Sequence, residues 1–447
     1  MSGLTADGCK FPILRHVYVK CPQLTINDCK SKKRGNFMSG VYVEFFSDEA
    51  LENVMCLLHY QPAKVIYLGL KATMLTRKIN SLSAFAKLRS PKTVLEFIEV
   101  PRDDLEKCID VLTEISDKYP EAVYELTGGS EMTLIAFGIL SAKRNLNTVR
   151  IDPYTTTEVH FTKDGIPIQH HDDIKMTVND NIVLHGGSLS NQTGNYSVWN
   201  FTDDFKQDIR DIWAIAASVR HKWNQYGALI EDCIKSHPAE PGGYYVLPKS
   251  NLGEAISLFY ALNKAGKLYD FRDFPKRIQF RFKNDGIKQI VTKTGNILEL
   301  HVYEVASRKP SLFNDEVIGA VIDWNGGKTV EQKKEFERQY QIYMNSNYDT
   351  VNEIDVILMR SVIPTFISCK SGRAGSLALH ELQTVTHRFG GNYARKALVM
   401  ALPCDNSTNG TSFFKQRAKE MHIWVIDNVY SMTDETLLKK LIRIQGD

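Results

Sequence analysis

Short apolar strands alternate with helical segments in the N-terminal third of the chain, and this alternation constrains the fold more than any other feature. Runs rich in Val, Ile, Tyr and Phe predict strands, and segments with apolar residues at helical spacing follow them. The predicted strands span 41–46, 65–69, 93–100 and 122–126, and the predicted helices begin near residues 51, 105 and 131. Parallel strands need such crossover helices, whereas antiparallel strands can join through short turns. We therefore predict an α/β fold with a Rossmann-like parallel sheet.

Two loops follow the carboxyl ends of these strands, which is where ligands bind in open α/β sheets. Phe46-Ser47 ends the first strand, and Ser47-Asp48-Glu49 is expected to cap the next helix. Thr127-Gly128-Gly129-Ser130 follows the fourth strand. Its glycines allow backbone N–H groups to approach a ligand, and the helix start favours an anion, although Glu131 argues against a phosphate directly on the turn. The loop matches neither a Walker A nor a GxGxxG pattern, so a plain tight turn is an equally good interpretation.

The C-terminal part contains an acidic strand start and a lysine strand end. Glu353 and Asp355 open an apolar strand at 352–359, and the strand at 363–370 ends in Ser368-Cys369-Lys370. Strand alternation puts Ser368 and Lys370 on one face and Cys369 on the other. A hairpin would bring the Asp355 carboxylate close to the Lys370 ammonium, as metal-assisted phosphodiester hydrolysis requires. A half-buried hairpin with solvated ends is the alternative.

Flanking helices support the catalytic interpretation. Glu299 lies in a predicted helix near 296–303, and an amphipathic helix downstream stops at Gly390-Gly391. A helix with Glu, a strand, a strand with Asp, a strand with Lys and a helix resemble the PD-(D/E)xK nuclease superfamily, with Ser368 at a usually acidic position. The resemblance implies that Asp355 binds Mg²⁺ or Mn²⁺ with the Cys369 carbonyl as a second ligand. It also implies that Glu299 contributes directly or through water, and that Lys370 orients the attacking hydroxide.

The two N-terminal loops resemble those of the CRISPR-associated Rossmann fold sensor domain, which recognise cyclic oligoadenylate across a homodimer interface. With the nuclease-like motifs, the chain resembles the Card1/Can2-like ancillary nucleases of type III CRISPR systems, the DUF1887 type. This resemblance implies a homodimer, cyclic tetra-adenylate as activator, and DNA or RNA as substrate with low sequence specificity. The activator-binding residues that it implies are Phe46, Ser47, Thr127, Gly128, Gly129, Ser130, Met132 and Thr133.

The expected domain organisation follows from these motifs. An N-terminal extension is expected at 1–40, the sensor domain at 41–155, a connector at 156–285 and the nuclease domain at 286–447. Because Ser368 replaces an acid, a catalytically inactive, nucleotide-responsive regulator that binds nucleic acid remains the competing hypothesis.

Composition excludes several other classes. A net charge of +3 over 447 residues does not by itself indicate nucleic-acid binding, and no apolar run approaches the length of a membrane span. Eight cysteines without a CxxC pair favour a reduced, cytoplasmic protein. His160, His170 and His171 are expected in a solvated hairpin rather than a zinc site. The basic run at 276–283 is read as an edge strand guarded by charge, narrowly preferred over a nucleic-acid contact.

Overall fold

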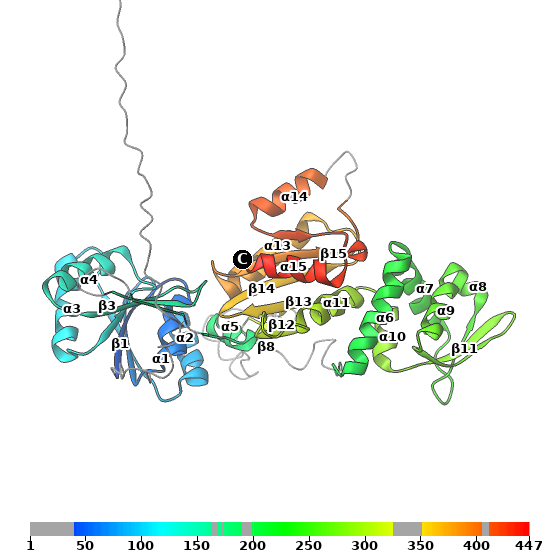
Figure 1. Ribbon diagram of the computed structural model, residues 1–447, viewed down its shortest axis with the longest axis horizontal. Coiled ribbons are helices and arrows are strands. Elements are labelled where there is room, and N and C mark those ends of the chain that lie inside the picture. The colour runs from blue at the N-terminus through cyan, green and yellow to red at the C-terminus, as the bar shows by residue number, and fades with distance from the viewer. Residues whose placement is uncertain are drawn as a thin grey trace, which may run out of the picture. The chain divides into compact units, whose positions relative to one another are not determined.

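The computed structural model contains an α/β domain, a small mixed segment and a second α/β domain (Figure 1). It describes residues 40–161, 168–171, 173–189, 199, 201–324, 351–404 and 411–446. The predicted N-terminal extension therefore lies outside the described residues, apart from Gly40. No helix within the described ranges is long and apolar enough to cross a membrane.

The N-terminal sheet confirms the predicted α/β fold. Its strand order is β3-β2-β1-β4-β5-β6-β7, in which β1 to β5 are parallel and β6 and β7 are antiparallel. The strands are β1 (Val41–Phe45), β2 (Lys64–Leu70), β3 (Val94–Val100), β4 (Val123–Glu125), β5 (Asn147–Ile151), β6 (Thr157–Phe161) and β7 (Ile168–His171). The helices are α1 (Met55–Tyr60), α2 (Thr76–Arg89), α3 (Leu105–Lys118) and α4 (Glu131–Lys143).

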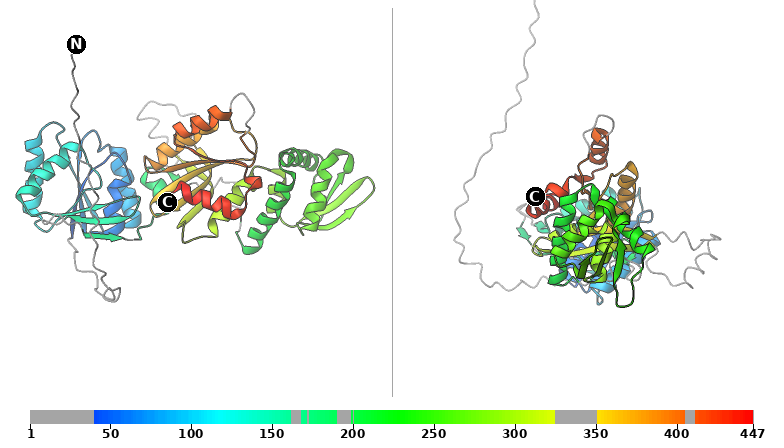
Figure 2. Two further views of the ribbon diagram at one scale, coloured as in Figure 1. Left: turned by 45° about the horizontal axis from the view of Figure 1, so that its top comes forward. Right: turned by 90° about the vertical axis from the view of Figure 1, so that its right-hand side faces the viewer.

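Helices cover both faces of this sheet, which explains why its strands are apolar without clean alternation. On one face Val43 and Ile66 pack against Phe137 and Leu140 of α4. Residues of β1 and β2 on the other face pack in a separate cluster with Phe85 of α2. Figure 2 (left) shows the sheet between these two helix layers. Strand order reverses between β1 and β4, so the predicted ligand loops follow the two strands at the switch point.

Two local features differ from the sequence predictions. The helix after β1 begins only with a 3₁₀ turn at Glu52–Val54, and Ser47 does not cap it. Asn53 instead fixes the loop between them: its Oδ1 accepts a hydrogen bond from Ser47 N (2.8 Å), and its Nδ2 donates one to Ser47 O (2.9 Å). The sheet also continues past residue 155, since β6 and β7 extend its edge. The predicted histidine hairpin is thus part of this sheet.

The middle segment is helical with a small antiparallel sheet ordered β10-β11-β9. α5 (Val178–Leu184) and β8 (Ser188–Leu189) precede it, and β8 joins the C-terminal sheet. The elements of the segment are α6 (Asp203–Val219), α7 (Lys222–Ser236), β9 (Tyr245–Pro248), α8 (Lys249–Leu252), α9 (Ile256–Lys264), β10 (Leu268–Asp273), β11 (Arg277–Phe282) and α10 (Asp285–Thr292).

The basic strand β11 lies between β9 and β10, so its prediction as an edge strand was wrong. Its charges are matched by neighbouring acids. Arg281 pairs with Asp270 (2.6 Å), and Lys283, just after the strand, bonds Asp204 and Asp208 at 2.7 and 2.9 Å. A solvent-facing edge is therefore unnecessary to accommodate these cations.

The C-terminal sheet has the order β16-β15-β14-β13-β12-β8, with β12 to β14 antiparallel and β14 to β16 parallel. Its strands after β8 are β12 (Asp315–Asp323), β13 (Val351–Arg360), β14 (Ile363–Lys370), β15 (Arg395–Met400) and β16 (Trp424–Ile426). The helices are α11 (Asn296–Ser307), α13 (Ser376–Gly390), α14 (Thr411–Glu420) and α15 (Asp434–Ile444).

Residues of β14 alternate between two cores. Ile367 and Cys369 belong to a cluster with Leu298 of α11 and Leu441 of α15. Phe366 belongs to a different cluster with residues of α13. Alternation therefore turns Ser368 and Lys370 toward the α13 side of the sheet.

Candidate functional site

The β13–β14 hairpin brings Asp355 against Ser368-Cys369-Lys370, as the sequence predicts. The strands pair with Val356 opposite Ile367. Asp355 Oδ2 accepts from the backbone N–H of Cys369 (2.5 Å) and from Ser368 Oγ (3.2 Å). The aspartate is thus held at the backbone of the residue between the serine and the lysine.

Glu299 on α11 lies close enough to Asp355, Glu353 and Lys370 for their charges to shift its pKa. The pKa of Glu299 is raised to about 9, mainly by burial and then by the negative charges of Asp355 and Glu353, while the charge of Lys370 lowers it. Burial also raises the pKa of Asp355, against the lowering effect of the Cys369 N–H, Lys370 and Ser368. Crowded carboxyl groups whose ionised forms are disfavoured gain most from a nearby cation.

The donor set fits a hard divalent cation with few protein ligands. Within the described ranges no three His, Cys, Asp or Glu side chains form a metal-binding group. Glu299, Asp355 and Glu353 are the carboxyl groups whose charges interact here. Mg²⁺ binds proteins through one or two carboxylates and retains water, so carboxyl groups of this kind are compatible with it. The Cys369 thiol is buried, and burial raises the pKa of this thiol well above its usual value.

The two N-terminal loops lie against each other. A Cβ added at Gly128 would lie 2.9 Å from Ser47 Cβ, and one at Gly129 would lie 2.5 Å from Phe45 Cβ. Gly129 also has a φ of +118°, which side chains on L residues rarely adopt. Both glycines are therefore required by the close approach of the loop after β4 to the end of β1.

Several side chains among the predicted activator ligands have internal partners. Phe46 is 2% exposed and packs against Tyr67 and Phe97. Ser130 and Thr133 form the capping box of α4: Thr133 N donates to Ser130 Oγ (3.3 Å) and Ser130 N donates to Thr133 Oγ1 (3.1 Å). These residues shape the loops by packing and capping.

Thr127 is hydrogen-bonded to the buried carboxyl group of Glu125. Its backbone N–H donates to Glu125 Oε1 (3.0 Å), as does its hydroxyl, and its Oγ1 accepts from Ile151 N (3.0 Å). Met132 is partly buried against the α4 side of the sheet. The backbone of Gly128 and Gly129 is thus the part of this loop best able to meet a ligand.

Sequence reasoning missed a buried acid pair beneath the loops. Glu44 of β1 lies opposite Glu125 of β4, and both are buried. Burial raises the pKa of Glu125 to about 7 and raises that of Glu44 well above its usual value, helped by the charge of Glu125. A glutamate within an otherwise apolar strand, one or two residues before each loop, is the sequence signal that could have found the pair.

This pair predicts a pH dependence of stability. Because the folded pKa of Glu125 is raised above 4.5, the folded state keeps its proton longer than the unfolded state, and stability falls as the pH rises from about 4.5 to 7.

Glu44→Gln removes one charge from the pair. The difference in unfolding temperature between pH 5 and pH 8 should therefore shrink, with a gain on the order of 2 kcal/mol at pH 8. Glu106→Gln, at an exposed position on α3, should leave the difference unchanged. An equal or larger pH difference in Glu44→Gln, measured by thermal unfolding, would contradict the shared burial of charge.

Comparison with known proteins shows the fold. No family model matches the chain, and no curated protein matches its sequence. Among solved structures, protein VC1899 from Vibrio cholerae is similar with a TM-score of 0.69 and 15% identity, over 90% of this chain and 97% of that one. Can2 from Sulfobacillus thermosulfidooxidans, solved in complex with cyclic tetra-adenylate, has a TM-score of 0.63 and 18% identity, over 92% of this chain and 98% of that one. The similarity spans both α/β domains and the segment between them.

Proposed function

We propose that the protein is a cyclic tetra-adenylate-activated, divalent-metal-dependent endonuclease of type III CRISPR defence, which cleaves DNA or RNA with low sequence specificity. The observation that carries this proposal is the placement of Asp355 and Glu299 around the Ser368-Cys369-Lys370 strand end. The fold shared with Can2, which was solved with cyclic tetra-adenylate, supports the activator assignment.

The residues divide the chemical work as follows. A divalent cation, Mg²⁺ or Mn²⁺, supplies a Lewis acid and acidifies water when bound. The carboxylates of Asp355 and Glu299 and the carbonyl of Cys369 would hold it. Lys370 orients the attacking water and offsets charge that develops on the phosphoryl oxygens. Ser368 donates to Asp355 and so fixes the orientation of that carboxylate.

A nucleotide-responsive regulator that binds but does not cleave is the second candidate, and Ser368 at the usually acidic position favours it. The two functions separate in one assay with supercoiled plasmid and single-stranded RNA, titrated with Mn²⁺ and with or without cyclic tetra-adenylate. The nuclease proposal requires activator-dependent shortening of at least one substrate. Mobility shifts without shortening at every metal concentration would instead support the regulator.

A ligand-gated homodimer is expected. Each chain contributes one pair of loops at the β1–β4 switch point, whereas a cyclic tetranucleotide has two-fold symmetry. A C2 dimer presents the same loops twice and matches that symmetry, so one activator should bind two chains. Sedimentation should show a dimer in the presence of activator, and calorimetry a ratio near 0.5 ligand per chain. A monomer under both conditions, or one ligand per chain, would contradict the shared pocket.

A further inference from the structure

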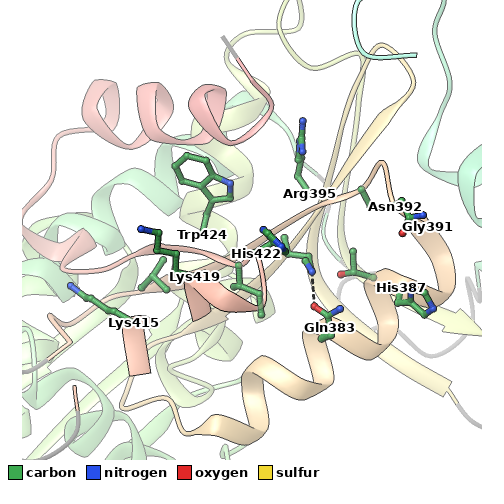
Figure 3. A pocket seen from close by; sticks show the side chains of 14 residues that line it. Gln383, His387, Gly391, Asn392, Arg395, Lys415, Lys419, His422 and Trp424 are labelled. Atoms are coloured by element: carbon green, nitrogen blue, oxygen red, sulfur yellow. Dashed lines mark hydrogen bonds between the residues drawn. The ribbon is translucent and has the colours of Figure 1, made fainter. Parts of the chain in front are cut away.

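A basic cavity of about 740 Å³ lies at the β15–β16 edge of the C-terminal sheet, and its lining does not include Lys370. It is formed by the C-terminal half of α13, the start of β15, the helix α14 and the start of β16. Figure 3 shows Arg395, Lys415, Lys419 and Trp424 around it. Of the described residues that line the cavity, four are lysine or arginine and none is acidic.

The cavity contains polar groups that the fold leaves unsatisfied. Thr386 is only 2% exposed, and its buried hydroxyl has no hydrogen-bond partner among the described residues. The buried Nε of Arg395 likewise has none there.

Lys396 carries a charge that no described acid neutralises in a salt bridge. Its Nζ donates to Gln383 Oε1 (2.5 Å) and to the carbonyl of Met421 (2.7 Å), which are neutral acceptors. On α14, Lys415 and Lys419 are one turn apart and share a face. Lys415 pairs with Asp427 (2.8 Å), whereas Lys419 is exposed. The cavity therefore presents an excess of positive charge.

Trp424 adds a stacking surface to this charge. It begins β16, the edge strand of the sheet, and is 44% exposed. Cations that follow phosphates together with an aromatic face for bases are the features of single-strand binding sites. A small anion would need the cations but not the indole.

The cavity lies at the start of β15, and the proposed catalytic end lies at the opposite ends of β14 and β15. Thr365 of β14 pairs with Arg395, and Lys370 pairs with Met400, so five residues of parallel strand separate the two places. At ~3.3 Å per residue this is about 16 Å. A strand of several nucleotides could span that distance, whereas a mononucleotide could not.

We propose that this cavity binds a single-stranded polynucleotide segment, with its phosphates on Arg395 and Lys419 and one base stacked on Trp424. The inference rests on the proposed nuclease function for the identity of the strand as substrate, because the cavity would hold a part of it remote from the cleaved bond.

The test measures binding without cleavage. Fluorescein-labelled dT12 and U12 are titrated with the full chain in EDTA, and anisotropy gives the Kd. Trp424→Ala and Lys419→Ala should each raise the Kd about tenfold for at least one strand, because stacking on one base alone is worth about 1–3 kcal/mol. Lys419→Ala should also reduce the slope of log Kd against log salt by about 0.7, which is the loss of one phosphate contact on a single strand.

Matched variants guard against misfolding. Trp424→Phe keeps an aromatic face and should bind within about threefold of the unaltered protein. Lys440→Ala, an exposed lysine on α15, should change neither Kd nor salt slope. Unchanged binding in both Trp424→Ala and Lys419→Ala would overturn the proposal, as would adenosine monophosphate binding as tightly as dT12 and U12, which would indicate a mononucleotide site.

Strand binding at the cavity and nuclease activity can each fail independently of the other. Strand binding that depends on Trp424 in a protein that cleaves nothing would reject the nuclease and keep this site. Activated cleavage together with undiminished binding by both alanine variants would reject this site and keep the nuclease.

Discussion

Lys370→Ala is expected to lower activator-dependent cleavage by about 10²–10³-fold, the typical effect of removing one group that stabilises transition-state charge. Lys370 ends β14 beside Asp355 and Glu299, and its charge lowers the pKa of both. The variant therefore loses both the offset to phosphoryl charge and part of what keeps the carboxyl groups ionised. Initial rates on plasmid and RNA at saturating Mn²⁺ and cyclic tetra-adenylate measure this effect.

The loss should be confined to chemistry. Lys370 is only partly buried at a strand end, where an ion pair contributes little stability, so the unfolding temperature should change by no more than a few degrees. Activator affinity should be unchanged, because the loops at β1 and β4 belong to the other sheet. Lys264→Ala, an exposed lysine on α9, serves as the matched control with full activity expected. Turnover by Lys370→Ala at the rate of this control would refute the catalytic assignment.

Gly129→Ala is expected to weaken cyclic tetra-adenylate binding by about tenfold or more and to prevent activation at limiting ligand. Gly129 has a φ of +118°, and its added Cβ would lie 2.5 Å from Phe45 Cβ. A side chain in a left-handed conformation costs about 1–2 kcal/mol even without a clash, and 1.4 kcal/mol is a factor of ten in affinity. The loop must shift to relieve the unfavourable φ and the close approach to Phe45, and its backbone N–H groups shift with it.

Gly138 of α4 provides a matched glycine. A Cβ added there meets nothing within 4 Å, so Gly138→Ala should bind activator normally and gain about 1 kcal/mol of stability from better helix propensity. Calorimetry with cyclic tetra-adenylate compares the two alanine variants directly. Equal affinities would exclude the loop at 127–130 as part of the activator pocket.

Local sequence patterns predicted the elements that carry the candidate sites. The apolar runs around Val43 and Ile66 form parallel strands because helices cover both faces of the sheet. Asp355 and Cys369 meet because the hairpin register follows from two apolar strands joined by a short turn. In these places neighbouring residues determine the structure, so periodicity was sufficient.

The sequence-based predictions that disagree with the structure concern contacts between residues far apart in the sequence. β11 lies in the centre of its sheet, where acids of β10 and α6 pair with Arg281 and with Lys283 just after the strand, and no pattern within 276–283 shows those partners. Ser47 does not cap a helix because Asn53, six residues on, ties the same loop. The basic cavity joins α13, α14, β15 and β16, and its lysines and arginines come two from α14 and two from β15, so no basic run shows it. Tertiary pairing decides all three.

The ratio of cleavage rates with and without cyclic tetra-adenylate tests the central claim most directly, when it is measured at saturating Mn²⁺ in the unaltered protein and in Asp355→Asn. Asparagine keeps the shape of the side chain but removes the charge that a divalent cation requires. We expect a large activator-dependent ratio in the unaltered protein. In Asp355→Asn we expect loss of cleavage, with cyclic tetra-adenylate still bound at a ratio near 0.5 per chain. Cleavage by Asp355→Asn at the unaltered rate, or cleavage by the unaltered protein that ignores the activator, would contradict the central claim.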